Sequence, residues 1–138
     1  MSALKLGEHS TTFSGSPLVC AAGCAAIDAL LEEKLTERAA EMGKYFKAQL
    51  EGLQAKHKIV KEVRGLGLML GIELRFDVHN IVIKAEQRGV LVLDAGRTVV
   101  RLLPPLVIEK EQIDRAVMVL DEVLEEEENE RASSTVSN

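Results

Sequence analysis

Apolar residues recur at helical spacing in the first part of the chain. The pattern begins directly after Pro17 and predicts a helix over residues 17–31, because a proline at the first helical position loses no hydrogen bond. The polar residues 32–34 predict a bend. A second apolar stripe then predicts a second helix or a continuation of the first. Its members are Leu35, Ala39, Met42, Phe46, Leu50 and Leu53.

Shorter apolar runs in the middle of the chain predict a small sheet. The turn between the first two runs falls at Gly65-Leu66-Gly67, and a helix over residues 79–88 is expected to end at Gly89, a residue type that suits the end of a helix. The expected strands cover residues 59–64, 68–74, 90–93 and 99–103.

A last amphipathic stretch predicts a final helix over residues 110–124, with Ile113, Val117, Leu120 and Leu124 on its buried face. Residues 125–138 are acidic and rich in hydroxyl groups. Because such a segment buries little apolar surface, we expect it to be a mobile tail.

The order of these elements predicts an α+β fold, a mainly antiparallel sheet covered by helices. The chain has 138 residues, enough for one core. Its net charge of −5 and its aromatic content of 3% argue against a nucleic-acid partner or an anionic membrane. The sequence shows neither a long apolar run nor a leader, so we expect a cytoplasmic protein with no membrane contact.

Cys20 and Cys24 are the only cysteines, and their spacing places both thiols on one face of the first helix. A metal site needs more ligands than two thiols and the nearby His9 provide. We favour buried structural thiols, with a redox or metal-binding pair as the alternative.

Two features could bind an anion. Ser10, Thr11 and Thr12 precede a helix, where hydroxyl groups either cap the helix or meet a negatively charged ligand. Arg101 lies within an apolar stretch, where a permanent cation needs a carboxylate partner, either from the protein or from a substrate. The glycines of residues 65–71 have the wrong spacing for a dinucleotide loop and open a strand, so we interpret them as turn and packing residues.

Three ordered motifs resemble the class III aminotransferases, the pyridoxal-phosphate family of ornithine, acetylornithine and acetyl-lysine aminotransferases. They are residues 9–17 (His-Ser-Thr-Thr-Phe-Ser-Gly-Ser-Pro), 63–74 (Val-Arg-Gly-Leu-Gly-Leu-Met-Leu-Gly-Ile-Glu-Leu) and 100–108 (Val-Arg-Leu-Leu-Pro-Pro-Leu-Val-Ile). Their order and spacing match the C-terminal region of that family. The resemblance extends from Gly7 to Leu124 and is strongest to the acetylornithine and acetyl-lysine branch.

This resemblance implies the small C-terminal domain of a dimeric fold type I enzyme. Residues 1–16 would be a remnant of the phosphate-contact loop of the large domain, residues 17–55 linking helices, residues 56–124 the small domain and residues 125–138 the tail. Thr12 would bind the phosphate of the cofactor, pyridoxal 5'-phosphate, in the neighbouring subunit.

By the same resemblance, Thr11 would lie beside the amino-acid substrate. Arg101 would hold the substrate carboxylate or pair with an active-site glutamate, and Arg64 would be structural.

The sequence departs from the family at Ser10, Ser14 and Ser16, where the family has glycine or asparagine. No lysine lies in a motif like that of the family's Schiff-base lysine, so we expect no catalytic residue here and an inactive chain in isolation. The expected partners are a homodimer partner or an upstream aminotransferase segment. The alternative is a non-catalytic α+β assembly module that docks through residues 20–26.

Overall fold

The computed structural model describes residues 11–136, with side chains for residues 11–133. The chain divides into two compact units, Met1–Thr36 and Glu37–Asn138. The described part of the first unit contains one long helix, and the second contains a sheet with three helices.

Helix α1 (Pro17–Glu32) begins at the predicted proline. Ser16 precedes it in an extended conformation, and its side chain makes no capping hydrogen bond. The predicted bend is confirmed: the helix stops at Glu33, and Lys34 has a φ of 50°. None of the residues of α1 is buried.

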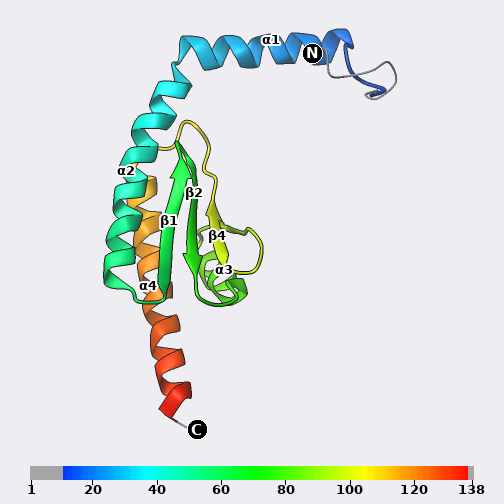
Figure 1. Cartoon of the computed structure of the whole chain (residues 1–138). Coiled ribbons are helices and arrows are strands. Elements are labelled where there is room, and N and C mark those ends of the chain that lie inside the picture. The colour runs from blue at the N-terminus through cyan, green and yellow to red at the C-terminus, as the bar shows by residue number, and fades with distance from the viewer. Residues whose placement is uncertain (1–10, 137–138) are drawn as a thin grey trace, which may run out of the picture. The chain divides into compact units, whose positions relative to one another are not determined.

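The second unit is built on a four-stranded antiparallel sheet with the strand order β1-β2-β4-β3 (Figure 1). The predicted α+β fold is therefore confirmed. The strand that was expected over residues 90–93 is shorter than predicted. The strands are β1 (Val60–Leu66), β2 (Met69–Leu74), β3 (Leu93–Asp94) and β4 (Val99–Leu102).

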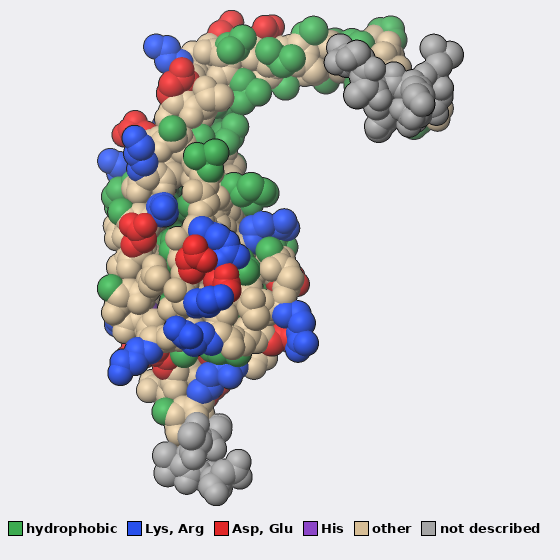
Figure 2. Space-filling view, viewed as in Figure 1, with side chains coloured by type: hydrophobic (Ala, Val, Ile, Leu, Met, Phe, Trp, Pro, Cys, Tyr) green, Lys and Arg blue, Asp and Glu red, His purple; other side chains and the backbone are tan. Residues whose placement is uncertain are grey.

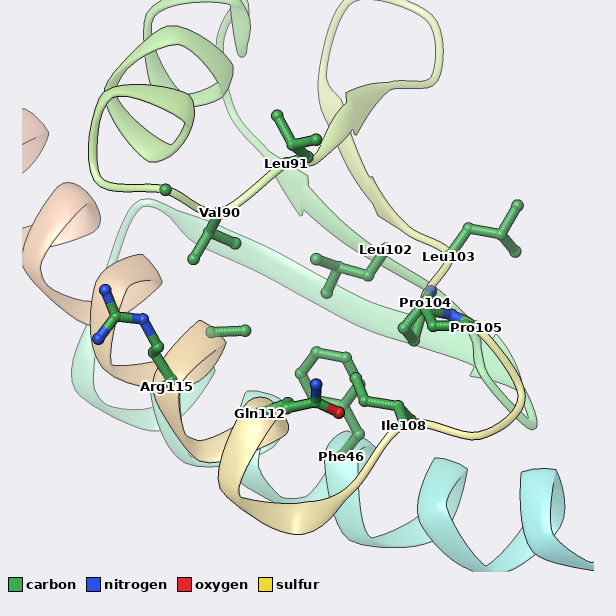
Figure 3. A pocket seen from close by; sticks show the side chains of 12 residues that line it. Phe46, Val90, Leu91, Leu102, Leu103, Pro104, Pro105, Ile108, Gln112 and Arg115 are labelled. Carbon is green, nitrogen blue, oxygen red and sulfur yellow. The ribbon is translucent and has the colours of Figure 1, made fainter.

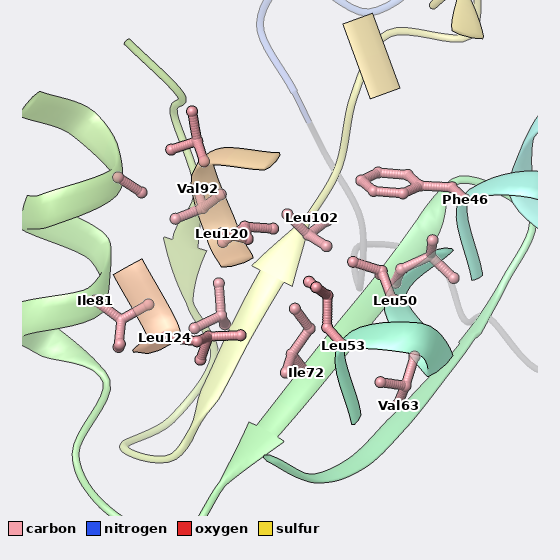
Figure 4. Packing of buried hydrophobic residues seen from close by; sticks show 14 of the residues in the cluster. Phe46, Leu50, Leu53, Val63, Ile72, Ile81, Val92, Leu102, Leu120 and Leu124 are labelled. Atoms are coloured by element: carbon pink, nitrogen blue, oxygen red, sulfur yellow. The ribbon is translucent and has the colours of Figure 1, made fainter. Parts of the chain in front are cut away.

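Helices α2 (Leu35–Lys56) and α4 (Lys110–Val136) run side by side along one face of the sheet (Figure 1). The predicted stripe of α2 is buried at Met42, Phe46, Leu50 and Leu53. In Figure 4, Leu53 of α2 points toward Ile72 of β2. Helix α3 (His79–Gln87) adds Ile81 and Ala85 to the same core.

The division into units differs from the predicted one, which grouped residues 17–55 as linking helices. Because the apolar stripe of α2 packs on the sheet, almost the whole of α2 belongs to the sheet unit, and the boundary falls after Thr36. In the described residues, no helix is long and apolar enough to cross a membrane.

The predicted end of the last helix at Leu124 is wrong, because α4 continues to Val136. Carboxylates of the acidic segment are paired with cations. Glu127, with 3% of its side chain exposed, lies 2.7 Å from Arg131 and 3.4 Å from Lys84 of α3. Ion pairing therefore replaces the apolar burial that the sequence lacks here, and the stretch that we expected to be a mobile tail is helical as far as Val136.

Candidate functional site

The face of the sheet that points away from α2 and α4 contains the candidate residue Arg101. Burial alternates along β2 and β4, so Val100 and Leu102 face the core and Arg101 faces the opposite side. The strand register aligns four residues in one row across this face: Arg64, Gly71, Arg101 and Leu93.

Arg101 has no carboxylate partner among the described residues, and its buried Nε makes no hydrogen bond there. Burying part of a guanidinium without a partner costs free energy, because its N–H groups lose water. Of the two partners that the sequence left open, the protein carboxylate is not present in the described part of the chain. The guanidinium group of Arg101 can therefore donate hydrogen bonds to an external carboxylate.

Arg64, in the same row, is in a different state. Its Nη1 lies 2.9 Å from Glu62 and also donates to Glu73, which raises the pKa of Arg64, chiefly through Glu73. Hydrogen bonds from Lys61 and Arg64 hold the pKa of Glu73 below its usual value. Figure 2 shows basic and acidic side chains next to one another over the strands. The charge of Arg64 is thus compensated within the sheet.

A cavity of about 430 Å³ connects the two arginines. Glycines at positions 65 and 71 form part of its wall, so backbone without a side chain lines the hollow at these two positions. Apolar side chains of Leu66, Met69 and Val99 complete the wall. The site is a shallow, largely apolar hollow with one uncompensated cation.

Thr11 and Thr12 lie in the first unit, immediately before α1, and both are exposed. They are not the cap of this helix, because Ser16 holds that position. No hydrogen bond of either hydroxyl group occurs within the described residues, so both can donate to a ligand. Ser10, the third member of the predicted cluster, lies outside the described residues.

The expectation of buried thiols is wrong for this chain, since Cys20 and Cys24 are both exposed. Their helix has no buried residue. No group of three or more potential metal ligands occurs among the described residues.

A second cavity, of about 420 Å³, lies between the end of β4 and the start of α4 (Figure 3). Its wall is mainly apolar, with Phe46, Leu102 and Ile108 among its residues, and Gln112 and Arg115 lie at its edge. Leu102 faces the opposite side of β4 from Arg101, so this cavity is separate from the arginine site. It contains none of the residues that the sequence singled out.

The sequence matches the family described as Aminotransferase class-III over residues 1–124. The fold and this match agree with the resemblance found in the three motifs. The chain belongs to the class III aminotransferases.

Curated aminotransferases are similar in sequence to this chain. An acetylornithine aminotransferase of Caldanaerobacter subterraneus subsp. tengcongensis is 46% identical over 123 residues, which are 88% of this chain and 31% of that protein. The acetylornithine aminotransferase of Methanosarcina mazei is 52% identical over 84% of this chain and 29% of its own length. The chain thus spans about a third of the length of the curated relatives that it matches.

Solved structures agree with the observed fold. An acetylornithine aminotransferase from Elizabethkingia anophelis superposes with a TM-score of 0.79 at 34% identity, over 91% of this chain and 34% of that one. An ornithine aminotransferase from Toxoplasma gondii gives a TM-score of 0.83 at 34% identity, over 95% and 32%. The predicted likeness to a domain of the pyridoxal-phosphate aminotransferases is confirmed.

Proposed function

We propose that this chain is the C-terminal part of a pyridoxal-phosphate-dependent aminotransferase that acts on acetylornithine, ornithine or acetyl-lysine type substrates. The observation that carries the proposal is Arg101, a partly buried arginine without a carboxylate partner in the described structure, on the open face of the sheet. Every substrate of such an enzyme carries a carboxylate. The names of the relatives support the same substrate class.

Arg101 binds and orients the substrate carboxylate, or an active-site glutamate supplied by the rest of the enzyme. A guanidinium can donate two parallel N–H bonds to a carboxylate, which fixes the direction of the bound molecule as well as its position. The wall around this contact is largely apolar, with Leu66 and Met69 exposed on it. Arg64 keeps the sheet edge in place through Glu62 and Glu73.

Thr12 is the residue of this chain that would hold the cofactor phosphate, in the site of the neighbouring subunit. The donor set fits a phosphate: its hydroxyl is exposed and has no protein partner in the described structure. Hydrogen bonds to a charged group contribute about 1.5–3 kcal/mol each. When bound, pyridoxal phosphate supplies the electron sink for amino-group transfer. Thr11 lies beside the substrate.

The partner is an upstream aminotransferase segment together with a second copy of the enzyme. Exposed apolar side chains of α1, among them Leu18 and Leu31, support this assignment, since they are 82% and 72% exposed. An apolar helix of this length normally buries one face. The relatives, three times as long, contain the protein mass that would cover it.

The test is complementation. The chain is mixed with the N-terminal two-thirds of the Caldanaerobacter enzyme, and amino transfer from N-acetylornithine is measured in the presence of pyridoxal phosphate. We expect activity only in the mixture, because the Schiff-base lysine is not in this chain. Arg101→Gln should raise the KM for the substrate at least tenfold, whereas Arg115→Gln, away from the site, should not change it.

Visible absorbance of an internal Schiff base in the chain alone would show that a lysine was missed and would contradict the proposal. Complementation without any effect of Arg101→Gln would contradict the role of Arg101.

The exposed apolar surface of α1 also favours a second candidate, a non-catalytic assembly module that docks through residues 20–26. Light scattering with and without the upstream segment separates the two. A stable complex that forms without pyridoxal phosphate and never transfers amino groups would favour the module.

A further inference from the structure

Gly71 occupies the central position of the arginine row. It pairs with Arg64 on β1 and with Arg101 on β4, so it is the residue between the two guanidinium-bearing strands. A side chain at this position would point to the same face as both arginines and into their cavity. Gly71 therefore decides whether the space between the arginines is open or filled.

The backbone does not require a glycine here. Gly65 and Gly67 have φ values of 152° and 54°, which L residues rarely adopt, but Gly71 does not share this conformation. A Cβ at position 71 would lie 3.1 Å from Cγ1 of the Val99 side chain and at least 3.9 Å from any other neighbour. The fold can therefore accept alanine if the Val99 side chain moves by a few tenths of an ångström, so neither backbone conformation nor backbone packing requires a glycine at this position.

The charges around Gly71 leave one place for an anion. Arg64 and Lys61 are engaged with the carboxylates of Glu62 and Glu73, while Arg101 has no such partner in the described chain. An entering carboxylate thus meets one uncompensated cation in this hollow, and Gly71 lines the same hollow next to Arg101. A methyl group at position 71 would occupy part of the hollow that the carboxylate needs, without altering any charge.

We propose that Gly71 is a specificity-determining residue: the carboxylate bound by Arg101 lies over its Cα, on the open face of β2 between Arg64 of β1 and Arg101 of β4. This inference rests on the proposed function, since it adds to it where the carboxylate lies. Arg101 provides the charge that binds a carboxylate, and Gly71 determines which carboxylates fit.

The experiment uses the full chain and follows the side-chain Nε–Hε resonance of Arg101 by NMR, assigned with Arg101→Lys, during titration with acetate and with N-acetylornithine. We expect a saturable shift in the unmodified chain and at least fivefold weaker binding in Gly71→Ala. The matched control is Gly52→Ala, an exposed helical position where a Cβ meets nothing within 4 Å. It should bind as the unmodified chain does.

The double variant Gly71→Ala/Val99→Ala removes the 3.1 Å contact between the new Cβ and Val99 Cγ1 but keeps the methyl group at position 71. It should bind as weakly as Gly71→Ala, and it serves in place of the single variant if that variant does not fold. Recovery of full affinity in the double variant would overturn the inference, because the loss would then come from Val99. Unchanged affinity in Gly71→Ala would also overturn it and leave Arg101 in its role. The absence of a saturable response in the unmodified chain would overturn the assignment of Arg101, and the inference with it.

Discussion

Helix α1 and the last turns of α4 behave in opposite ways from what their composition suggests. The first is apolar, yet none of its residues is buried. The second is a run of acidic residues, yet Glu127 is buried, and Glu125 and Glu130 are ion-paired to Lys56 of α2 and Lys84 of α3. The difference shows that burial depends on what lies opposite a helix, in addition to how hydrophobic the helix is.

The contacts of the acidic turns explain their order. Lys84 of α3 lies 2.8 Å from Glu130 and 3.3 Å from Glu126, and Arg131 stacks on Phe76 with 3.4 Å between guanidinium carbon and ring centroid. The buried His57, at the end of α2, lies between Asp121 at 2.6 Å and Glu128 at 3.2 Å. Helix α4 thus joins α2 to α3. Helix α1 makes no comparable set of contacts within the described residues.

The largest expected effect comes from leucines of the two helices. Leu120 of α4 is fully buried and Leu31 of α1 is 72% exposed. Leu120→Ala should lower the free energy of unfolding by about 2–5 kcal/mol, because it leaves a cavity in the core. Leu31→Ala should change it by about 0.5 kcal/mol or less. Urea denaturation followed by circular dichroism measures both, and equal losses would mean that α1 is packed in solution.

A smaller effect is expected from matched acidic residues. Glu127→Gln should cost about 1–3 kcal/mol of unfolding free energy, since it leaves Lys84 and Arg131 with fewer partners in a buried setting. Glu32→Gln, at the exposed end of α1, should have almost no effect. The same denaturation experiment tests this pair. A neutral Glu127→Gln would show that the acidic turns do not stabilise the unit.

The smallest effect is a dependence on acid. Burial opposes ionisation of Asp121, but hydrogen bonds from Lys56 and His57 outweigh it and lower the pKa of Asp121. A hydrogen bond from Lys84 lowers the pKa of Glu126 in the same direction. The unfolded chain then takes up protons first, near its ordinary carboxyl pKa of about 4. This stability is present above that pH and is lost as the pH falls through the lower folded pKa values.

The urea midpoint should therefore fall as the pH is lowered below about 4.5, and Asp121→Asn should flatten the fall. Asp28→Asn, on the exposed α1, is the control and should leave the profile unchanged. If Asp121→Asn leaves the pH dependence of the urea midpoint unchanged, the hydrogen bonds of Asp121 to Lys56 and His57 are not its cause.

Local sequence determined much of this protein. Pro17 and the break at residues 33–34 set the bounds of α1, and the spacing of Met42, Phe46, Leu50 and Leu53 set the buried face of α2. Alternation in β2 and β4 placed Arg101 on the face opposite the core. These features follow from helical and strand periodicity and from backbone restrictions, which act over a few residues.

Tertiary structure alone decided the rest, because most of the deciding contacts join different strands and helices. The state of the two arginines depends on Glu62 and Glu73, which reach Arg64 but leave Arg101 without a partner in the described chain. The acidic turns of α4 are held by Lys56 of α2 and Lys84 of α3, whereas no residue of α1 is buried in the described structure. The hydropathy of a segment indicates how much free energy it would gain from burial. Only the folded structure determines which surface or charged group lies against it.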